Sequence, residues 1–420
     1  MKTEILGVKE TVAYYISNLI GAGILVVPAI AYSVGGVYVF AIWLLLIIAS
    51  WPLAKVFAII SIRYPHNSGI LHFLHLKASK GISQFVDDVM IFVMLVGNPT
   101  LGFVASRYAI SAFGLDGDIF FYPLAFFFMA FSVMFNMLGL RSSSRLQFIL
   151  TFVMLFVLLS IATLATYWNI DNTQLVLQPS TATEFVSIET LLQTLGICFF
   201  VFVGWENVAA IAPNVKERAR TFNKSILISV PLVGACYLFI AFALALSATQ
   251  TEAKANFAVL DLMTAPFKGG FLPVLVSLFS IFIVVVSCNA WVLAASKVLN
   301  GLSLSGRLPK FLSKETNGTP YIALIVLLIC YGLVILMSYL FGNQEDLIIR
   351  YSSAGFITIY IIVQWYFFKL EKARKERFLA LVGLIFTLLA ASGLYFEVML
   401  WIVMGFALWA IRQFRVKNRV

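Results

Sequence analysis

The stretch SNLIGAGILVVPA, from Ser17 to Ala29, lies inside an uncharged apolar run that extends from residue 11 to residue 34. A run of this length can cross a bilayer, because a hydrocarbon core of about 30 Å needs roughly 20 apolar residues in a helix. Yet Gly21, Gly23 and Pro28 stand in its middle, where glycine costs a helix up to about 1 kcal/mol and proline about 3 kcal/mol. Irregular backbone at membrane depth is tolerated only where it is buried in protein or lines a cavity. The stretch therefore predicts an interrupted membrane helix beside an internal site.

The composition of the whole chain agrees with a membrane protein. Of its 420 residues, 61% are hydrophobic and only 11% are charged, whereas a soluble protein keeps about 25% of its residues charged. We expect an all-α integral membrane protein that forms a single transmembrane domain over residues 1–420, with about twelve membrane helices. The apolar runs that predict these helices are 11–34, 37–62, 89–113, 119–140, 146–168, 190–213, 225–248, 271–296, 320–341, 347–368, 378–396 and 398–411.

The net charge of +10 has a topological explanation. Most of the 29 lysines and arginines fall in alternate loops, as in FFKLEKARKER at 367–377. Cytoplasmic loops carry this excess in membrane proteins. The pattern predicts an even number of spans with both termini in the cytoplasm. It gives no reason to expect nucleic acid as a partner, and it leaves lipid as the surrounding medium.

A second interruption occurs in CFFVFVGWENVAAIAP, at 198–213. Gly204 stands in the middle of this run, beside Glu206, and a proline closes it. The two interruptions open two sets of five spans, 11–168 and 190–368, and two extra helices follow at 378–411. Paired interrupted helices at corresponding places in two halves are the best sequence indication of a transporter binding site.

Interrupted helices also predict what the site binds. Unwinding frees N–H groups near Ala22, Gly23 and Ile24, which attract an anion at the start of the second half-helix. It also frees carbonyl groups near Leu19 and Ile20, which accept from an ammonium or coordinate a cation. Donors for a carboxylate beside acceptors for an ammonium favour an α-amino acid. The alternative is that the glycines only permit close packing of helices.

The remaining reactive residues do not indicate an enzyme. His66, His72 and His75 follow the second apolar run in an H-x5-H-x2-H pattern, but no cysteine or acid accompanies them, and a surface or amphipathic linker is the favoured interpretation. The four cysteines are scattered singly through predicted helices. No catalytic triad, phosphate-binding loop or zinc-protease pattern is visible. We expect no enzymatic activity, no metal and no cofactor.

Four segments resemble signatures of the amino acid–polyamine–organocation (APC) superfamily of transporters. They are NLIGAGILVVPA at 18–29, RYPHNSGILHFL at 63–74, FVGWENVAAIAPNVKERART at 202–221 and SKVLNGLSLSGRLP at 296–309. Two departures are Ser68, where the first of two glycines is usual, and Lys297, where an arginine is usual. The superfamily resemblance implies the five-plus-five inverted repeat with discontinuous helices 1 and 6, and an amino acid substrate.

Within the superfamily, the chain is similar to the small bacterial amino acid exporters. The segments FAIISIRYP at 57–65 and EDLIIRYSSAGFITIY at 345–360 carry this resemblance. It implies a secondary active transporter in the bacterial cytoplasmic (inner) membrane. Such a protein would move methionine, leucine, isoleucine and valine by alternating access, as an exporter or antiporter.

The resemblance also implies roles for particular residues. Backbone N–H groups at 21–23 would bind the substrate carboxylate, and carbonyls at Leu19, Phe200 and Val203 would accept from its ammonium. The Phe200 ring would cover the substrate, while Asn98 and Trp291 would line the pocket. The complete set of expected substrate-binding residues is Leu19, Gly21, Ala22, Gly23, Ile24, Asn98, Phe200, Val203, Gly204, Trp291 and Ser352.

Two ionisable residues within predicted helices are candidates for gating, since such groups are functional hypotheses by default. Glu206 flanks the second break and is interpreted either as a proton-sensitive gate or clamp, or as a structural hydrogen-bond anchor. Lys55 lies inside the second helix, where it could pair with Glu206 or Asp87, or extend its ammonium to the interface.

The coupling ion is less constrained by the sequence. Some relatives place a lysine halfway along the fifth helix in place of a sodium ion, but Met154 aligns there. Ser280 and Ser287 could help to hold sodium in the eighth helix, or could simply pack against backbone. We expect no obligatory sodium, which leaves protons as the candidate coupling ion.

The expected pocket favours a neutral apolar substrate. Its candidate side chains include Trp205, Cys288 and Trp291, and the sequence offers no acid except Glu206 to a cationic side chain. Trp291 could instead stack on a cation, so a cationic amino acid or polyamine exchanger remains an alternative. A non-transporting membrane sensor is the alternative from a different class.

Overall fold

The computed structural model describes residues 5–172, 187–249, 252–253, 259–264, 271–342 and 345–417, and these ranges are helical apart from short connections. The longer helices are α1 (Val8–Leu19), α2 (Val27–Gly35), α3 (Val39–Arg63), α4 (Ile70–Lys77), α5 (Lys80–Gly97), α6 (Pro99–Phe113), α7 (Gly117–Met137), α8 (Leu140–Trp168), α10 (Ile188–Phe199), α11 (Arg218–Ser247), α13 (Val259–Thr264), α14 (Leu272–Leu304), α15 (Tyr321–Phe341), α16 (Glu345–Leu370), α17 (Arg374–Ser392) and α18 (Tyr395–Lys417). The 3-10 helices that matter for the site are η1 (Ala22–Leu25), η4 (Phe200–Phe202) and η5 (Asn207–Asn214).

Every predicted apolar run contains helix, but the count of twelve spans is not confirmed. Among the described residues, nine helical stretches are long and apolar enough to cross a membrane. The pair α17 and α18, which meet at an angle of 105°, passes the same test only when taken together. The count falls short because the first run is divided between α1, η1 and α2, so that α1 has only 12 residues.

The first predicted interruption is present in the structure. Helix α1 ends at Leu19 because Ile20 adopts an extended conformation, with φ −99° and ψ 101°. The four residues of η1 follow, and Pro28 then occupies the first turn of α2. Proline is tolerated there because its missing N–H would have no intrahelical partner.

The second interruption lies against the first. Helix α10 gives way to η4 at Phe200, Val203 is extended, and Gly204 has a φ of +135°, a conformation that favours glycine. A Cβ atom on Gly204 would lie 3.1 Å from the carbonyl oxygen of Asn18. The Asn207 amide donates to the side-chain oxygen of Asn18 at 3.0 Å. The two breaks therefore meet in the interior of the bundle.

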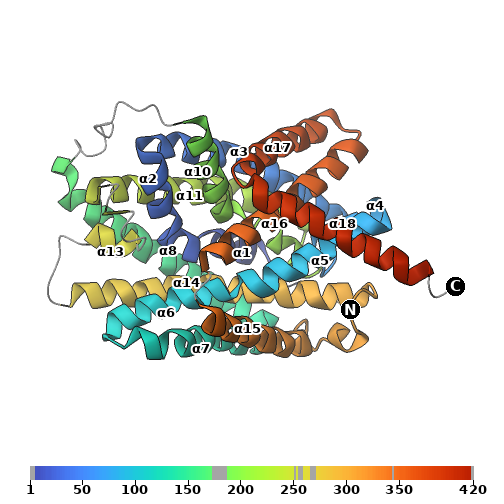
Figure 1. Ribbon diagram of the computed structural model, residues 1–420, viewed down its shortest axis with the longest axis horizontal. Helices are drawn as coiled ribbons and strands as arrows, with labels where there is room; N and C mark the ends of the chain where they lie inside the picture. The colour runs from blue at the N-terminus through green and yellow to red at the C-terminus, as the bar shows by residue number, and fades with distance from the viewer. Residues whose placement is uncertain are drawn as a thin grey trace.

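The surrounding helices hold both breaks in place. Figure 1 shows α1 in the middle of the molecule, with α14, α6, α7 and α15 on one side and α3, α10 and α17 on the other. Helix α1 packs against α8, α11 and α14, and α10 packs against α2, α3 and α17. Most residues of α1, from Thr11 to Leu19, are buried. The site is therefore enclosed by long, regular helices.

One helix extends beyond its predicted start. The run 89–113 corresponds to α5 and α6, but α5 begins at Lys80. Its first turns carry Asp87, whose carboxylate lies 2.8 Å from His75 Nε2 and accepts from Arg307 Nε at 2.8 Å. Hydropathy detects only the apolar part of such a helix, because these polar turns are stabilised by the contact with His75 of α4 and by the ion pair with Arg307, just after α14.

The histidines after α3 are partly buried linker residues. The His66 and His72 rings stack with centroids 4.3 Å apart. Burial and then the nearby His75 lower the pKa of His72 below its usual value. Within the described residues, no group of three or more metal-ligating side chains could hold a metal ion.

Candidate functional site

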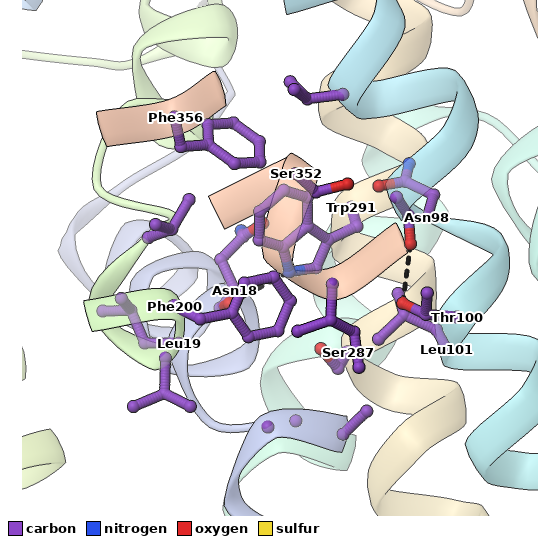
Figure 2. Close-up of a pocket in the computed structure, with 18 residues that line it drawn as sticks. Asn18, Leu19, Asn98, Thr100, Leu101, Phe200, Ser287, Trp291, Ser352 and Phe356 are labelled. Atoms are coloured by element: carbon purple, nitrogen blue, oxygen red, sulfur yellow. Dashed lines mark hydrogen bonds between the residues drawn. The ribbon is translucent and has the colours of Figure 1, made fainter. Parts of the chain in front are cut away.

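A cavity lies where the two broken helices face α5, α6, α14 and α16. Figure 2 shows side chains from these elements pointing into one space. The free volume is about 50 Å³, and a single water needs at least about 10–15 Å³ measured in this way. Its lining residues are Asn18, Leu19, Gly21, Ala22, Gly23, Val93, Gly97, Asn98, Thr100, Leu101, Phe200, Val201, Val203, Ser287, Trp291, Ile349, Ser352 and Phe356.

The first break presents backbone donors to the cavity. Ala22 and Gly23 begin η1, and the first bond of this turn runs from Ile24 N to Gly21 O at 3.2 Å. The N–H groups of the residues before Ile24 are therefore not used by the turn itself. Such groups are suited to bind a carboxylate.

Glycine is required in this turn by close neighbours. A Cβ atom on Gly21 would collide with the side chain of Ser287, and one on Gly23 would lie 2.7 Å from Val201 Cγ1. Both contacts are shorter than ordinary van der Waals separations. The glycines thus bring the backbone of the first break directly against α14 and the second break.

Carbonyl groups at the end of α1 already accept hydrogen bonds from side chains. The Tyr237 hydroxyl donates to Leu19 O at 2.7 Å, and Trp291 Nε1 donates to Asn18 O at 3.0 Å. A carbonyl oxygen has two lone pairs, so each can accept a second donor. An ammonium at Leu19 would therefore share this carbonyl with Tyr237.

The side of the cavity formed by α5, α6 and α16 carries small polar groups. The Asn98 amide donates to the Tyr331 hydroxyl at 2.8 Å, and the Thr100 hydroxyl donates to Gly97 O at 2.6 Å. The Ser352 hydroxyl is buried and has no hydrogen-bond partner among the described residues. A Cβ atom on Gly97 would lie 2.8 Å from Ser352 Oγ. Of the three polar side chains Asn98, Thr100 and Ser352, only Ser352 makes no hydrogen bond to the described residues.

Aromatic and aliphatic side chains form the rest of the lining. The Trp291 and Phe356 rings meet edge to face, with centroids 5.7 Å apart, and the Phe200 ring lies beside Trp291 in Figure 2. No ionisable side chain belongs to the lining that the described residues form. Any charge on a bound molecule would have to be compensated by backbone groups and neutral dipoles.

Glu206 lies at the second break but outside the lining. Its Oε2 atom accepts from Gly204 N at 3.0 Å and from the Tyr360 hydroxyl of α16. The side chain is only 2% exposed, and Oε1 has no hydrogen-bond partner among the described residues. Glu206 thus connects the irregular backbone of the second break to α16.

The structure brings most of the predicted substrate-binding residues together. All of them except Ile24 and Gly204 line the cavity. Trp205 and Cys288, which were also expected near the substrate, lie elsewhere: Trp205 packs against Tyr15 with ring centroids 5.5 Å apart, and Cys288 contacts Met129. Ser287 lines the cavity, whereas the hydroxyl of Ser280 donates to a carbonyl of its own helix.

Lys55 contacts neither of the acids considered for it. Its ammonium lies 3.1 Å from the side-chain oxygen of Asn223 and 5.3 Å from the ring centroid of Trp51. Asp87 pairs with His75 and Arg307 instead. The structure therefore places Lys55 apart from the cavity and from Glu206.

Several lining residues are not predicted from the sequence. Gly97 and Thr100 could have been predicted, because Pro99 interrupts the apolar run between them and marks the boundary between α5 and α6. For the residues of α16 there was no such signal, since that helix has no break. The missed residues are Asn18, Val93, Gly97, Thr100, Leu101, Val201, Ile349 and Phe356.

A bundle of membrane helices with two touching breaks and a buried cavity between them defines a multi-pass membrane transporter. The chain belongs to the amino acid permease family, whose model matches residues 6–412. It is thus an amino acid transporter of the APC superfamily rather than an enzyme.

Individual relatives agree with this class. The chain is 25% identical over 55% of its length to the L-methionine/branched-chain amino acid exporter of Escherichia coli K12, and the match spans only about half, 54%, of that exporter. It is 23% identical to the cadaverine/lysine antiporter of the same strain, over 90% of this chain and 87% of the antiporter. It is also 26% identical to the low-affinity methionine permease of Saccharomyces cerevisiae, over 55% of this chain and 44% of the permease.

The fold also matches a solved transporter. The substrate-bound outward-open structure of a Na+-coupled sialic acid symporter superimposes with a TM-score of 0.58, over 93% of this chain and 89% of that one. The sequence identity is 10%, so this likeness concerns the fold alone. It supports the five-plus-five arrangement predicted from the two breaks.

Proposed function

We propose that this protein is a secondary active transporter of neutral hydrophobic L-amino acids, namely methionine, leucine, isoleucine and valine. It works as an exporter or antiporter by alternating access around the cavity between the two breaks. We place it in the bacterial cytoplasmic membrane with both termini in the cytoplasm, in accord with the distribution of its basic loops.

The absence of ionisable side chains from the described lining is the observation that carries this proposal. A zwitterionic backbone can be held by the N–H groups at Gly21–Gly23 and by nearby carbonyls. A cationic side chain would additionally require a buried counter-charge, because an unpaired charge in a low-dielectric site is strongly disfavoured. The lining instead offers Val93, Leu101 and Phe356 to an apolar side chain.

Access to the cavity requires movement of its walls. At about 50 Å³ the space accommodates a few water-sized groups. We propose that the Phe200 ring covers the substrate and moves as the two breaks rearrange. Glu206 joins the second break to Tyr360, so we assign it the proton-sensitive role in this rearrangement, with protons as the coupling ion.

The test is counterflow in proteoliposomes. Purified protein is reconstituted with millimolar unlabelled methionine inside, and labelled methionine, leucine or arginine is added outside without an ion gradient. Accumulation of labelled methionine and leucine, but not arginine, is the expected result. Absence of counterflow with every amino acid would contradict the proposal and favour a non-transporting sensor.

A cationic amino acid or amine exchanger is the second candidate, because the cadaverine/lysine antiporter matches most of the chain. In that case Trp291 would be a stacking platform for a cation. Replacing Trp291→Leu would then abolish counterflow of arginine or cadaverine and leave methionine unaffected. Under the neutral proposal, the same change weakens methionine and leucine counterflow.

A further inference from the structure

Lys55 occupies an unusual place for a charged residue in a membrane helix. It lies eight positions before the last residue of α3, Arg63, which is about 12 Å along the helix at 1.5 Å per residue. Its neighbours at helical spacing are Leu44 and Ile48, which are exposed, the latter by 69%, and Trp51, which like Lys55 is half-buried. Charged side chains in membrane helices almost always face the bundle interior or a cavity. Lys55 is instead half-buried at the surface of the bundle, where α3 lies beside α11.

The residues that the structure describes supply no counter-charge to this ammonium. The contacts of Lys55 are the amide oxygen of Asn223, at 3.1 Å, and the ring of Trp51, at 5.3 Å, and neither group carries a net charge. No carboxylate in the described parts of the chain forms an ion pair with Lys55. A half-buried cation without a counter-ion in a membrane helix is costly, so an external anion would stabilise it.

Further donors lie on α11, close to Asn223 in the sequence. Asn223 is exposed near the start of α11, which packs alongside α3. Its amide nitrogen has N–H donors left, since only its oxygen bonds to Lys55. Arg220 and Lys224, one helical turn before it and directly after it, are also exposed, and the Arg220 guanidinium pairs with Glu217 at 3.0 Å. We call Lys55, Asn223, Lys224 and Arg220 the α3–α11 basic site.

We propose that the α3–α11 basic site binds the phosphate group of an anionic phospholipid. The ammonium of Lys55 donates one hydrogen bond to Asn223 and has two donors left for phosphate oxygens. Basic pockets between membrane helices are suited to anionic headgroups, and tryptophan rings favour the headgroup level of a bilayer. Exposed apolar residues beside the site, Ile48 and Leu227, provide a surface for the acyl chains.

A lipid is favoured over a soluble phosphate by this placement. Lys55 lies near exposed apolar side chains of α3 and α11, which a soluble phosphate would not contact. An anionic lipid is favoured over a zwitterionic one because the site contains more than one cation. A zwitterionic headgroup would bring a further ammonium to the same place.

The matched variants are Lys55→Met, Lys55→Arg and Lys77→Met. Methionine keeps the length and apolar character of the lysine stem without its charge, and arginine keeps the charge and binds phosphate. Lys77 is an exposed lysine whose ammonium lies 5.7 Å from the Tyr64 ring centroid, but it belongs to α4. It therefore controls for a lysine stacked on an aromatic ring outside the α3–α11 basic site.

The experiment measures retained lipid by native mass spectrometry. Full-length protein in nanodiscs of phosphatidylcholine and phosphatidylglycerol is released into neutral detergent, and bound phosphatidylglycerol is counted. We expect Lys55→Met to weaken its retention about fivefold, and Lys55→Arg and Lys77→Met to retain it as the wild type does. Thermal unfolding in neutral detergent establishes that each variant is folded.

Three outcomes would overturn the proposal. One is unchanged retention in folded Lys55→Met, and another is equal loss in Lys55→Met and Lys55→Arg, since charge would then not matter. The third concerns the source of the phosphate: if millimolar inorganic phosphate displaces phosphatidylglycerol completely, the site belongs to a soluble anion. Equal loss in Lys77→Met would likewise remove the assignment to this particular site.

Discussion

At the scale of single residues, Gly97 and Ser352 define how α5 and α16 approach each other across the cavity. A methyl group on Gly97 would lie 2.8 Å from Ser352 Oγ and 3.2 Å from its Cβ atom. The absence of a side chain at position 97 therefore keeps the Ser352 hydroxyl in the cavity wall, where it has no described partner. We infer that this pair adjusts the width of the cavity.

The first prediction concerns this pair. Gly97→Ala should lower the free energy of unfolding by about 1–3 kcal/mol, as overpacking does, and the narrower cavity should raise the KM for methionine. The double variant Gly97→Ala with Ser352→Ala removes the closest contact and should recover part of that loss. Transport kinetics of the wild type, both single variants and the double variant measure the coupling. Strictly additive effects would show that the two residues do not interact in the transporting protein.

The second prediction concerns Glu206, which joins Gly204 to Tyr360. Glu206→Gln keeps the size of the side chain but removes its ability to ionise. Accumulation driven by a pH gradient should be lost, while counterflow of methionine without a gradient should persist. Both assays use the same proteoliposomes, so a folding defect would abolish the two together. Retained gradient-driven accumulation would assign the proton to another group.

At the scale of helices, the sequence predicted the breaks better than the cavity wall. Gly21, Gly204 and the prolines that follow them can be recognised in the sequence, because glycine and proline interrupt otherwise helical apolar runs. Phe356 and Ile349 cannot be recognised as cavity residues, because the sequence of α16 is that of an ordinary apolar helix. Which of its faces turns inward is decided by packing against α5 and α17, and no local propensity specifies that.

The third prediction tests a close approach between a helix and a loop. A Cβ atom on Gly301 of α14 would collide with the backbone at Asn67 and Ser68. Because this backbone cannot move aside as a flexible side chain would, Gly301→Ala should lower the free energy of unfolding by about 1–3 kcal/mol. Gly117→Ala is the control, since a Cβ atom there meets nothing within 4 Å. Thermal unfolding in detergent compares them, and equal midpoints would contradict the predicted contact.

At the scale of the whole molecule, the chain is one bundle in which the two breaks touch. The sequence predicted paired breaks through their corresponding places in the two halves of the chain. The number of crossings was harder to predict. Helices can be joined by sharp bends, such as the 105° angle between α17 and α18. Hydropathy gives the length of an apolar run but not the direction of the helix axis, so it cannot distinguish a bent pair from two crossings.

The fourth prediction concerns orientation in the membrane. If both termini are cytoplasmic, Asp118→Cys at the start of α7 should react with a membrane-impermeant maleimide in intact cells. Lys375→Cys at the start of α17 should react only after permeabilisation. Both positions are exposed in the structure, so accessibility of the folded protein does not limit the comparison. The reverse labelling pattern would invert the proposed topology.

The contact between Gly21 and Ser287 also constrains how this protein can evolve. The backbone at Gly21 lies so close to Ser287 that any side chain at position 21 would collide with it. No single substitution at position 21 is therefore tolerated. The two positions belong to opposite halves of the chain, yet they must be inherited as a matched pair. In diverging lineages, a larger residue at 21 should appear only together with glycine at 287, because a Cβ atom at 287 would itself lie 2.3 Å from the new side chain.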